Sequence, residues 1–305
     1  MPDRTMRGVY PILSIPFDSK GRVATEDFER LIDWTVGHRV HGVGVAMASE
    51  IYKLTEAERD SVIRTVVKQV GGKAKIVINT GAEGTDVAIH YSRRAEELGA
   101  HALMIRPPTY VPSGPDETVD YFKRIAEAVK IPIFLQDQST AQVGPALAVR
   151  CARAHPNLCY VKVESPPTAP RVAEAAKLRG DSGLILFGGA GGAFFLEELR
   201  RGAVGTMPGN TLPDVFVKVW DLWEAGKQAE AQREFHKYQP LIRTLGQGLG
   251  LANWIYKDVL VERGVIRPEA AFARHPSLKP DEIQRKEVVQ LLEELGLRSR
   301  AGARA

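Results

Sequence analysis

The stretch Cys159-Tyr160-Val161-Lys162-Val163-Glu164-Ser165-Pro166-Pro167 decides how the rest of the chain is organised. Its β-branched and aromatic residues predict a buried strand over Cys159–Val163, and the proline pair stops it. Because side chains alternate along a strand, Tyr160, Lys162 and Glu164 share one face, while the valines face covering helices. The strand therefore carries a lysine into an enclosed space.

Lys162 has two interpretations from this strand alone. Burying an unpaired ammonium is costly, so an enclosed lysine usually has a partner, a lowered pKa, or both. An amine of this kind can attack the carbonyl carbon of a substrate. The alternative is a structural lysine that pairs with Glu164 or extends toward the end of the strand.

The composition limits the class of protein. The chain has 305 residues, of which 44% are hydrophobic, and a net charge of +4. This length suits one large barrel domain, and no basic run interleaved with aromatics predicts a nucleic-acid partner. The two cysteines, Cys151 and Cys159, predict neither a disulfide framework nor a zinc site, so a reducing cytoplasm is expected. No signal sequence or membrane span is evident, and no membrane partner is expected.

Short apolar strands alternate with longer helical patterns along residues 1–225. Eight such pairs predict an α/β fold, a parallel sheet closed into a (β/α)8 TIM barrel that forms the catalytic domain. The expected strands are Val9–Ile15, Gly42–Ala46, Lys75–Thr80, Ala102–Ile105, Ile131–Gln136, Cys159–Val163, Leu184–Phe187 and Gly205–Met207. The expected helices are Thr25–Val36, Thr55–Val70, Thr85–Leu98, Glu117–Val129, Pro145–Ala154, Pro170–Leu178, Ala193–Arg201 and Pro213–Trp223. Thr25 and Thr55 are the expected helix caps, the latter in a capping box.

From residue 226 to residue 305 the strands stop. Helical patterns over Gln228–Leu245, Leu251–Arg263 and Asp281–Leu295 predict a helical C-terminal extension packed on the barrel. The tail from Arg298 to Ala305 is expected to fray.

In such barrels the chemistry lies at the carboxyl ends of the strands. The seven histidines are scattered without metal-ligand spacing, so no metal is expected. No serine lies in a Gly-x-Ser-x-Gly elbow, which leaves hydrolase chemistry without support.

Motifs after three of the expected strands, together with a lysine on a fourth, resemble those of the dihydrodipicolinate synthase and N-acetylneuraminate lyase family. They are Pro16-Phe17, Ser49-Glu50 with Leu54-Thr55-Glu56-Ala57-Glu58-Arg59, Pro107-Pro108 with Tyr110, and Lys162 itself. The likeness runs from about Gly8 to Arg274-His275-Pro276. It implies a class I lyase, an aldolase or dehydratase, in which Lys162 forms an imine with pyruvate or another 2-oxo acid. It also implies a homotetramer or homodimer, and no cofactor beyond this covalent imine.

The chain departs from the family's proton relay. Gln136 stands where the resemblance implies a relay tyrosine, and an amide cannot act as a general acid or base near neutral pH. Asp137, Glu164, or a water held by Gln136 and Gln138 could replace it. Tyr110 matches a family tyrosine that reaches a neighbouring subunit's site, but with its relay partner missing it could simply pack a dimer interface.

The loop after the second strand also departs from the family. Two threonine hydroxyls that the resemblance implies for binding the 2-oxo acid carboxylate are absent, and Ala48, Ser49 and Glu50 stand in this loop. Backbone N–H groups and Ser49 could still cradle a carboxylate. The alternative is that Met47 and Ala48 fill a pocket that no longer accepts pyruvate.

Four further residues are candidates for substrate binding. Arg106 either binds the carboxylate of an acidic substrate or forms a surface salt bridge. Gly188 and Gly189 belong to a loop that the resemblance places along the distal half of the substrate, and Met207 ends the neighbouring strand. The same glycine loop leaves a phosphosugar enzyme as a second alternative, although it lacks a P-loop lysine.

These observations predict a Schiff-base-forming lyase acting on a 2-oxo acid. Dihydrodipicolinate synthesis itself is disfavoured by Gln136 and the missing hydroxyls. The alternative from another class is a non-catalytic barrel that binds a small acid as a sensor.

Overall fold

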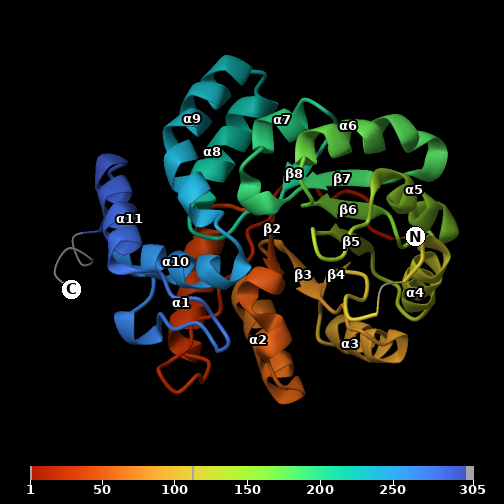
Figure 1. Ribbon diagram of the computed structural model, residues 1–305, viewed down its shortest axis with the longest axis horizontal. Helices are drawn as coiled ribbons and strands as arrows, with labels where there is room; N and C mark the ends of the chain where they lie inside the picture. Colours follow the sequence, from red (N-terminus) through yellow and green to blue (C-terminus); the bar gives the residue numbers. More distant parts are fainter. Residues whose placement is uncertain (1, 112, 300–305) are drawn as a thin grey trace.

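The strands of the chain close into a parallel barrel (Figure 1). The computed structural model describes residues 2–111 and 113–299, and its strands follow the order β1-β8-β7-β6-β5-β4-β3-β2. Ile12 bridges Gly44, and the Leu13 N–H donates to the Gly44 carbonyl at 2.8 Å, which joins the first and last strands of that order. The predicted (β/α)8 barrel is therefore confirmed. The strands are β1 Gly8–Val9, β2 Gly42–Val45, β3 Lys75–Asn79, β4 Ala102–Ile105, β5 Ile133–Asp137, β6 Tyr160–Val163, β7 Ile185–Gly188 and β8 Gly205–Thr206.

The first strand is shorter than predicted. It ends at Val9, and the chain continues through Pro11 to Ile12, which forms isolated bridges with Gly44 and with Gly209. A proline has no N–H to donate to a ladder, which explains why regular pairing stops there.

Helices alternate with the strands and surround them. They are α1 Thr25–Gly37, α2 Glu56–Val70, α3 Thr85–Glu97, α4 Pro115–Glu127, α5 Pro145–Ala154, α6 Thr168–Leu178, α7 Phe195–Leu199 and α8 Pro213–Glu224. Thr55 caps α2 as predicted, because its side chain accepts from the Glu58 N–H and its own N–H donates to the Glu58 carboxylate at 2.9 Å. The expected cap at Thr25 is wrong: the N-cap is Ala24, which makes no side-chain cap bond.

The interior of the barrel is filled at its amino end. The rings of Phe134 and Tyr160 stack with centroids 4.4 Å apart, and Phe187 packs edge-on against them. A Cβ on Gly42 would lie 2.1 Å from the Tyr10 ring, so only glycine leaves room for that ring. Packing at this end leaves the space for a ligand at the opposite, carboxyl end of the strands.

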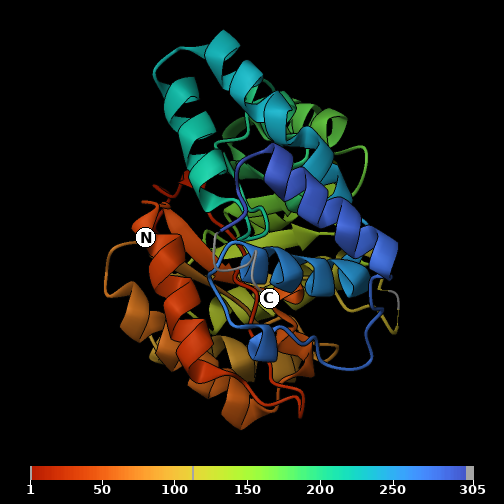
Figure 2. The same ribbon diagram turned by 90° about the vertical axis from the view of Figure 1, so that its left-hand side faces the viewer.

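The C-terminal extension is helical, as predicted. It consists of α9 Gln228–Leu245, α10 Leu249–Glu262 and α11 Glu282–Glu294. Figures 1 and 2 show α9 running beside α8, and α10 contacts the short helix η1 Met47–Ser49 that follows β2. The tail from Arg298 was expected to fray, but the Arg298 side chain pairs with Glu262 at 2.7 Å. Residues 300–305 of that tail lie outside the described residues. Within the described chain, no helix has the length and apolar character needed to span a bilayer.

Candidate active site

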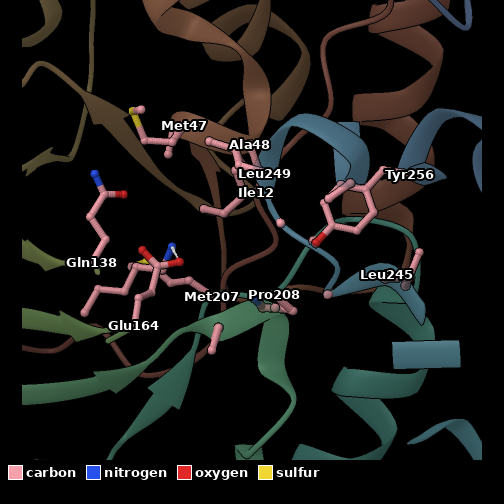
Figure 3. Close-up of a pocket in the computed structure, with 18 of the residues that line it drawn as sticks. Ile12, Met47, Ala48, Gln138, Glu164, Met207, Pro208, Leu245, Leu249 and Tyr256 are labelled. Carbon is pink, nitrogen blue, oxygen red and sulfur yellow. Dashed lines mark ion pairs between the residues drawn. The ribbon is translucent and has the colours of Figure 1, made fainter. Parts of the chain in front are cut away.

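A pocket of about 310 Å³ lies at the carboxyl ends of the strands (Figure 3). This volume falls at the small end of the range for small-molecule sites. The barrel contributes side chains from β5, from β6 and from the segment after β8, and the C-terminal extension contributes a further wall. The predicted site residues that line it are Ala48, Gln136, Lys162, Glu164 and Met207.

Lys162 and Glu164 form an ion pair in this pocket. The Lys162 Nζ lies 2.8 Å from the Glu164 Oε1. The lysine side chain is 3% exposed and the glutamate side chain 21% exposed. The alternation of β6 places both on the inner face, while Val161 and Val163 belong to the outer core. A nucleophile and a base within hydrogen-bond reach of each other is the arrangement that covalent catalysis requires.

Glu164 is held from its other side by a chain of amides. The Gln136 Nε2 donates to the Glu164 Oε2 at 3.0 Å, and the Asn79 Nδ2 donates to the Gln136 Oε1 at 3.0 Å. Asn79 and Gln136 lie at the carboxyl ends of β3 and β5, and Glu164 directly follows β6. Gln136 therefore fixes the orientation of the carboxylate, and its own amide has no acid–base capacity near neutral pH.

Gly189 sets the back wall behind Glu164. A Cβ on Gly189 would come within 2.2 Å of the Glu164 Cγ. Gly189 therefore acts through the carboxylate, and it does not itself line the pocket. Its neighbour Gly188 also lies outside the pocket, where a Cβ would strike the buried carboxylate of Glu198 at 1.8 Å. Ala190 and Gly191 are the members of this loop that reach the pocket.

The loop after β2 presents backbone and small side chains to the pocket. Met47 and Ala48 line it. Ser49 does not, because its hydroxyl accepts from the Ala46 N–H at 3.0 Å and is fully buried in the turn. Within the described chain, no hydrogen bond takes up the N–H groups of Met47 and Ala48, so two donors remain for an anion.

Asp137 was expected in the substrate site, and the structure places it outside the pocket. It follows Gln136 on β5, so strand alternation turns it to the outer face. There it accepts from the Arg171 guanidinium at 3.0 Å and from the Ser165 hydroxyl at 2.9 Å. Burial raises its pKa even with the arginine beside it. Asp137 ties β5 to the start of α6 and contacts no pocket space.

Arg106 and Tyr110 also lie away from this pocket. The Arg106 guanidinium pairs with Glu83 at 2.7 Å, and the same carboxylate accepts from the Thr109 and Tyr110 N–H groups. Within the single chain Arg106 therefore forms a salt bridge, with 13% of its side chain exposed. Tyr110 projects from the loop with 87% of its side chain exposed.

Glu50 is paired with other groups of the protein and does not line the pocket. Its carboxylate, 1% exposed, accepts from the Lys257 Nζ at 2.6 Å and from the Lys53 Nζ at 2.9 Å. It also accepts from the Arg274 N–H at 2.9 Å. Burial lowers the pKa of Lys257 to about 8. Glu50 therefore fastens the loop after β2 to α10 and has no oxygen left for a substrate.

The wall from the C-terminal extension was not among the predicted site residues. Leu245, Leu249, Ala252 and Tyr256 line the pocket from α9 and α10. One signal was present in the sequence: Leu251 to Tyr256 has a single polar residue, Asn253, so this part of the helix has no broad polar face, and in the structure residues 251–257 are all buried. A helix of that kind packs against two partners at once, and here the second partner is the mouth of the barrel.

The fold and the site define a class: a TIM-barrel enzyme with an enclosed amine and a carboxylate at the strand ends. A sequence model of the Dihydrodipicolinate synthetase family matches residues 5–295, and the chain belongs to that family. It is accordingly a lyase acting on a 2-oxo acid, which sets aside the non-catalytic sensor.

Relatives in this family differ in their reactions. The chain is 30% identical over 284 residues to the L-2-keto-3-deoxyarabonate dehydratase of Azospirillum brasilense, with 90% of each chain covered. The crystal structure of dihydrodipicolinate synthase from Rhodopseudomonas palustris superposes with a TM-score of 0.86 at 26% identity, covering 95% of this chain and 98% of that one. A structure described as the first monomeric dihydrodipicolinate synthase variant shares the fold, with a TM-score of 0.88 at 23% identity, covering 96% of this chain and 97% of that one.

Proposed function

We propose that the chain is a Schiff-base dehydratase of 2-keto-3-deoxy sugar acids, with Lys162 as the nucleophile and Glu164 as the general base and acid. The observation that carries the proposal is the 2.8 Å pair between the two side chains at the wall of the pocket. The similarity to an L-2-keto-3-deoxyarabonate dehydratase supports this substrate class. No cofactor is needed, because the amine of Lys162 supplies the covalent chemistry.

Imine formation is the first stage. Lys162 passes one proton to Glu164, and its nitrogen adds to carbon 2 of the substrate. A second proton from the nitrogen and the proton on Glu164 convert the carbonyl oxygen to water, which leaves. The product is an iminium ion on Lys162, with Glu164 again a carboxylate.

Elimination is the second stage. Glu164 takes a proton from carbon 3, and the electron pair forms an enamine. The enamine expels the hydroxyl on carbon 4, which leaves as water after receiving that same proton from Glu164. A water molecule then hydrolyses the conjugated iminium ion, so one water is lost overall and Lys162 is restored.

Gln136 favours dehydration over aldol cleavage. Cleavage between carbons 3 and 4 requires a base at the hydroxyl of carbon 4, and an amide cannot provide one. Dehydration needs only a carboxylate that removes a proton and returns it, which a single glutamate can do. The absence of a phenol at this position likewise disfavours dihydrodipicolinate synthesis.

In this proposal the substrate carboxylate binds at the loop after β2. The unpaired N–H groups of Met47 and Ala48 provide two donors, which replaces the side-chain hydroxyls that the loop lacks. Their small or flexible side chains leave space for the pyruvoyl end of the substrate.

Borohydride trapping tests the proposal. Incubation with pyruvate followed by reduction should add one reduced pyruvoyl group to Lys162, detected by mass spectrometry of the digested protein. Lys162→Met should give no adduct. Glu164→Gln should slow dehydration of a 2-keto-3-deoxy pentonate by about 10² to 10⁴-fold.

Two results would contradict the proposal. An unmodified Lys162 in the wild type would rule out the imine. Release of pyruvate from the substrate, in place of a dehydrated 2-oxo acid, would assign the chain as an aldolase.

We further propose that the chain is a homotetramer or homodimer in the cytoplasm. The exposed Tyr110 and Val111 support a subunit contact, because adjacent large apolar side chains at 87% and 75% exposure are typical of interfaces. The buried thiols of Cys151 and Cys159 are unpaired, which suits a reducing compartment.

A further inference from the structure

Tyr256 is the phenol that α10 brings to the pocket. Its hydroxyl is turned toward the space in front of Glu164 (Figure 3). The residue is 6% exposed, and no described residue hydrogen-bonds to its oxygen. A hydroxyl that faces a pocket without a protein partner is free to bind a ligand.

Burial keeps the Tyr256 hydroxyl in its neutral, donating form. Burial, together with the negative charge of Glu164, raises its pKa to about 12. Near neutral pH the group therefore presents a proton to any acceptor that enters the pocket.

The Tyr256 ring is held in place by its surroundings. A Cβ on Gly209 would lie 2.9 Å from the Tyr256 Cζ, so the ring packs directly on the backbone after β8. The next residue, Lys257, is fastened to Glu50 at 2.6 Å. A rigid donor binds with a smaller loss of conformational entropy than a mobile one.

The charged residues around the pocket limit which charge the far end of the substrate can carry. Among the described residues that line it, Lys162 and Glu164 are the only charged ones. Lys162 is taken up by the imine, so no cation remains for a second carboxylate. A carboxylate buried without a cationic partner is strongly disfavoured.

Resting on the proposed function, we propose that Tyr256 is a specificity-determining residue that donates a hydrogen bond to a hydroxyl on the substrate tail beyond carbon 4. The site accordingly takes monocarboxylic 2-keto-3-deoxy sugar acids with a neutral, hydroxylated tail. Analogues with a carboxylate at the far end are excluded.

The experiment compares the wild type with Tyr256→Phe and with Tyr238→Phe as a matched control. Tyr238 lies on α9 and does not line the pocket. Calorimetry measures binding of three ligands: pyruvate, a 2-keto-3-deoxy pentonate, and a 2-keto-3-deoxy sugar diacid. Borohydride adducts are measured in parallel on the same samples.

Tyr256→Phe should weaken binding of the pentonate about tenfold and leave pyruvate binding unchanged. Tyr238→Phe should change neither, and the wild type should bind the diacid more weakly than the pentonate. Equal binding of the pentonate by wild type and Tyr256→Phe, or a diacid bound as tightly as the pentonate, would overturn the inference. Failure of the proposed function has a separate sign: ligands bind, and no borohydride adduct forms on Lys162.

Discussion

Gly189 limits the positions that the Glu164 carboxylate can occupy. A methyl group at residue 189 would lie 2.2 Å from the Glu164 Cγ, so the carboxylate would have to move. Gly189→Ala should lower kcat for dehydration about 100-fold, since a displacement near 1 Å has that effect on a catalytic group. Steady-state kinetics give this value, and the Lys162 adduct with pyruvate should persist.

Gly37→Ala is the control for that substitution. No atom lies within 4 Å of a Cβ at Gly37. Unchanged kinetics in Gly189→Ala would show that Glu164 tolerates displacement and does not transfer the protons.

At this scale the sequence predicted the inner face of β6 and little around it. Two-residue alternation is enough to place Lys162 and Glu164 together, because Glu164 directly follows the strand that carries Lys162. The same rule turns Asp137 away, which the search for a replacement base overlooked. Glu50 pairs with Lys257, far along the chain, and Arg106 pairs with Glu83 in another loop. No local sequence pattern encodes such pairings.

Among the elements, α10 depends on a buried ion pair. Lys257 and Glu50 are each 1% exposed and lie 2.6 Å apart. Lys257→Met leaves the Glu50 Oε1 without its cation, while Lys53 and the Arg274 N–H stay on Oε2, so the free energy of unfolding should fall by roughly 3 kcal/mol. Urea denaturation measures this change.

Lys218→Met provides the comparison. Its side chain is 60% exposed and pairs with Glu234, so its loss should change the free energy of unfolding by less than about 1 kcal/mol. If Lys257→Met were equally mild, the pair would not hold α10 in place.

Most elements were predictable because their signals are local. Capping at Thr55 and the apolar strands set the boundaries of α2 and β4 closely. The contribution of α10 to the pocket could not be predicted, because the residues of the turn before it form no periodic pattern that would indicate the direction of the helix. That path alone decides whether Tyr256 faces the barrel mouth or another helix.

For the whole molecule, Glu198 should govern part of the pH dependence of stability. Its carboxyl is fully buried, and burial raises its pKa from 4.5 to about 7 although the neighbouring Thr168 hydroxyl lowers it. Between these values the native state holds a proton that the unfolded state has released. Stability should therefore fall as pH rises from about 4.5 to 7, by at most roughly 3 kcal/mol, and stay level above.

Glu198→Gln removes this titration. The difference in unfolding free energy between wild type and Glu198→Gln, measured by urea denaturation, should grow across that pH range. The surface variant Glu230→Gln should show no such trend. A difference that is constant from pH 4 to 8 would mean that the pKa of Glu198 does not change on folding.

The assembly should depend on the loop that carries Tyr110 and Val111. Val111→Asp places a charge at the proposed contact, so light scattering after gel filtration should show a smaller species. Ile283→Asp is a matched change at an aliphatic side chain of 69% exposure on α11. If Ile283→Asp dissociated the assembly and Val111→Asp did not, the subunit interface would lie at α11.

The pairing of Glu50 with Lys257 has a consequence for hybrids made from related enzymes. The two residues are 207 positions apart, one in the barrel and the other in the helices that follow it. A crossover at residue 225 would take them from different parents, and a parent without the matching partner would leave a bare charge inside the hybrid. Recombination libraries built on this scaffold should inherit both positions from the same parent.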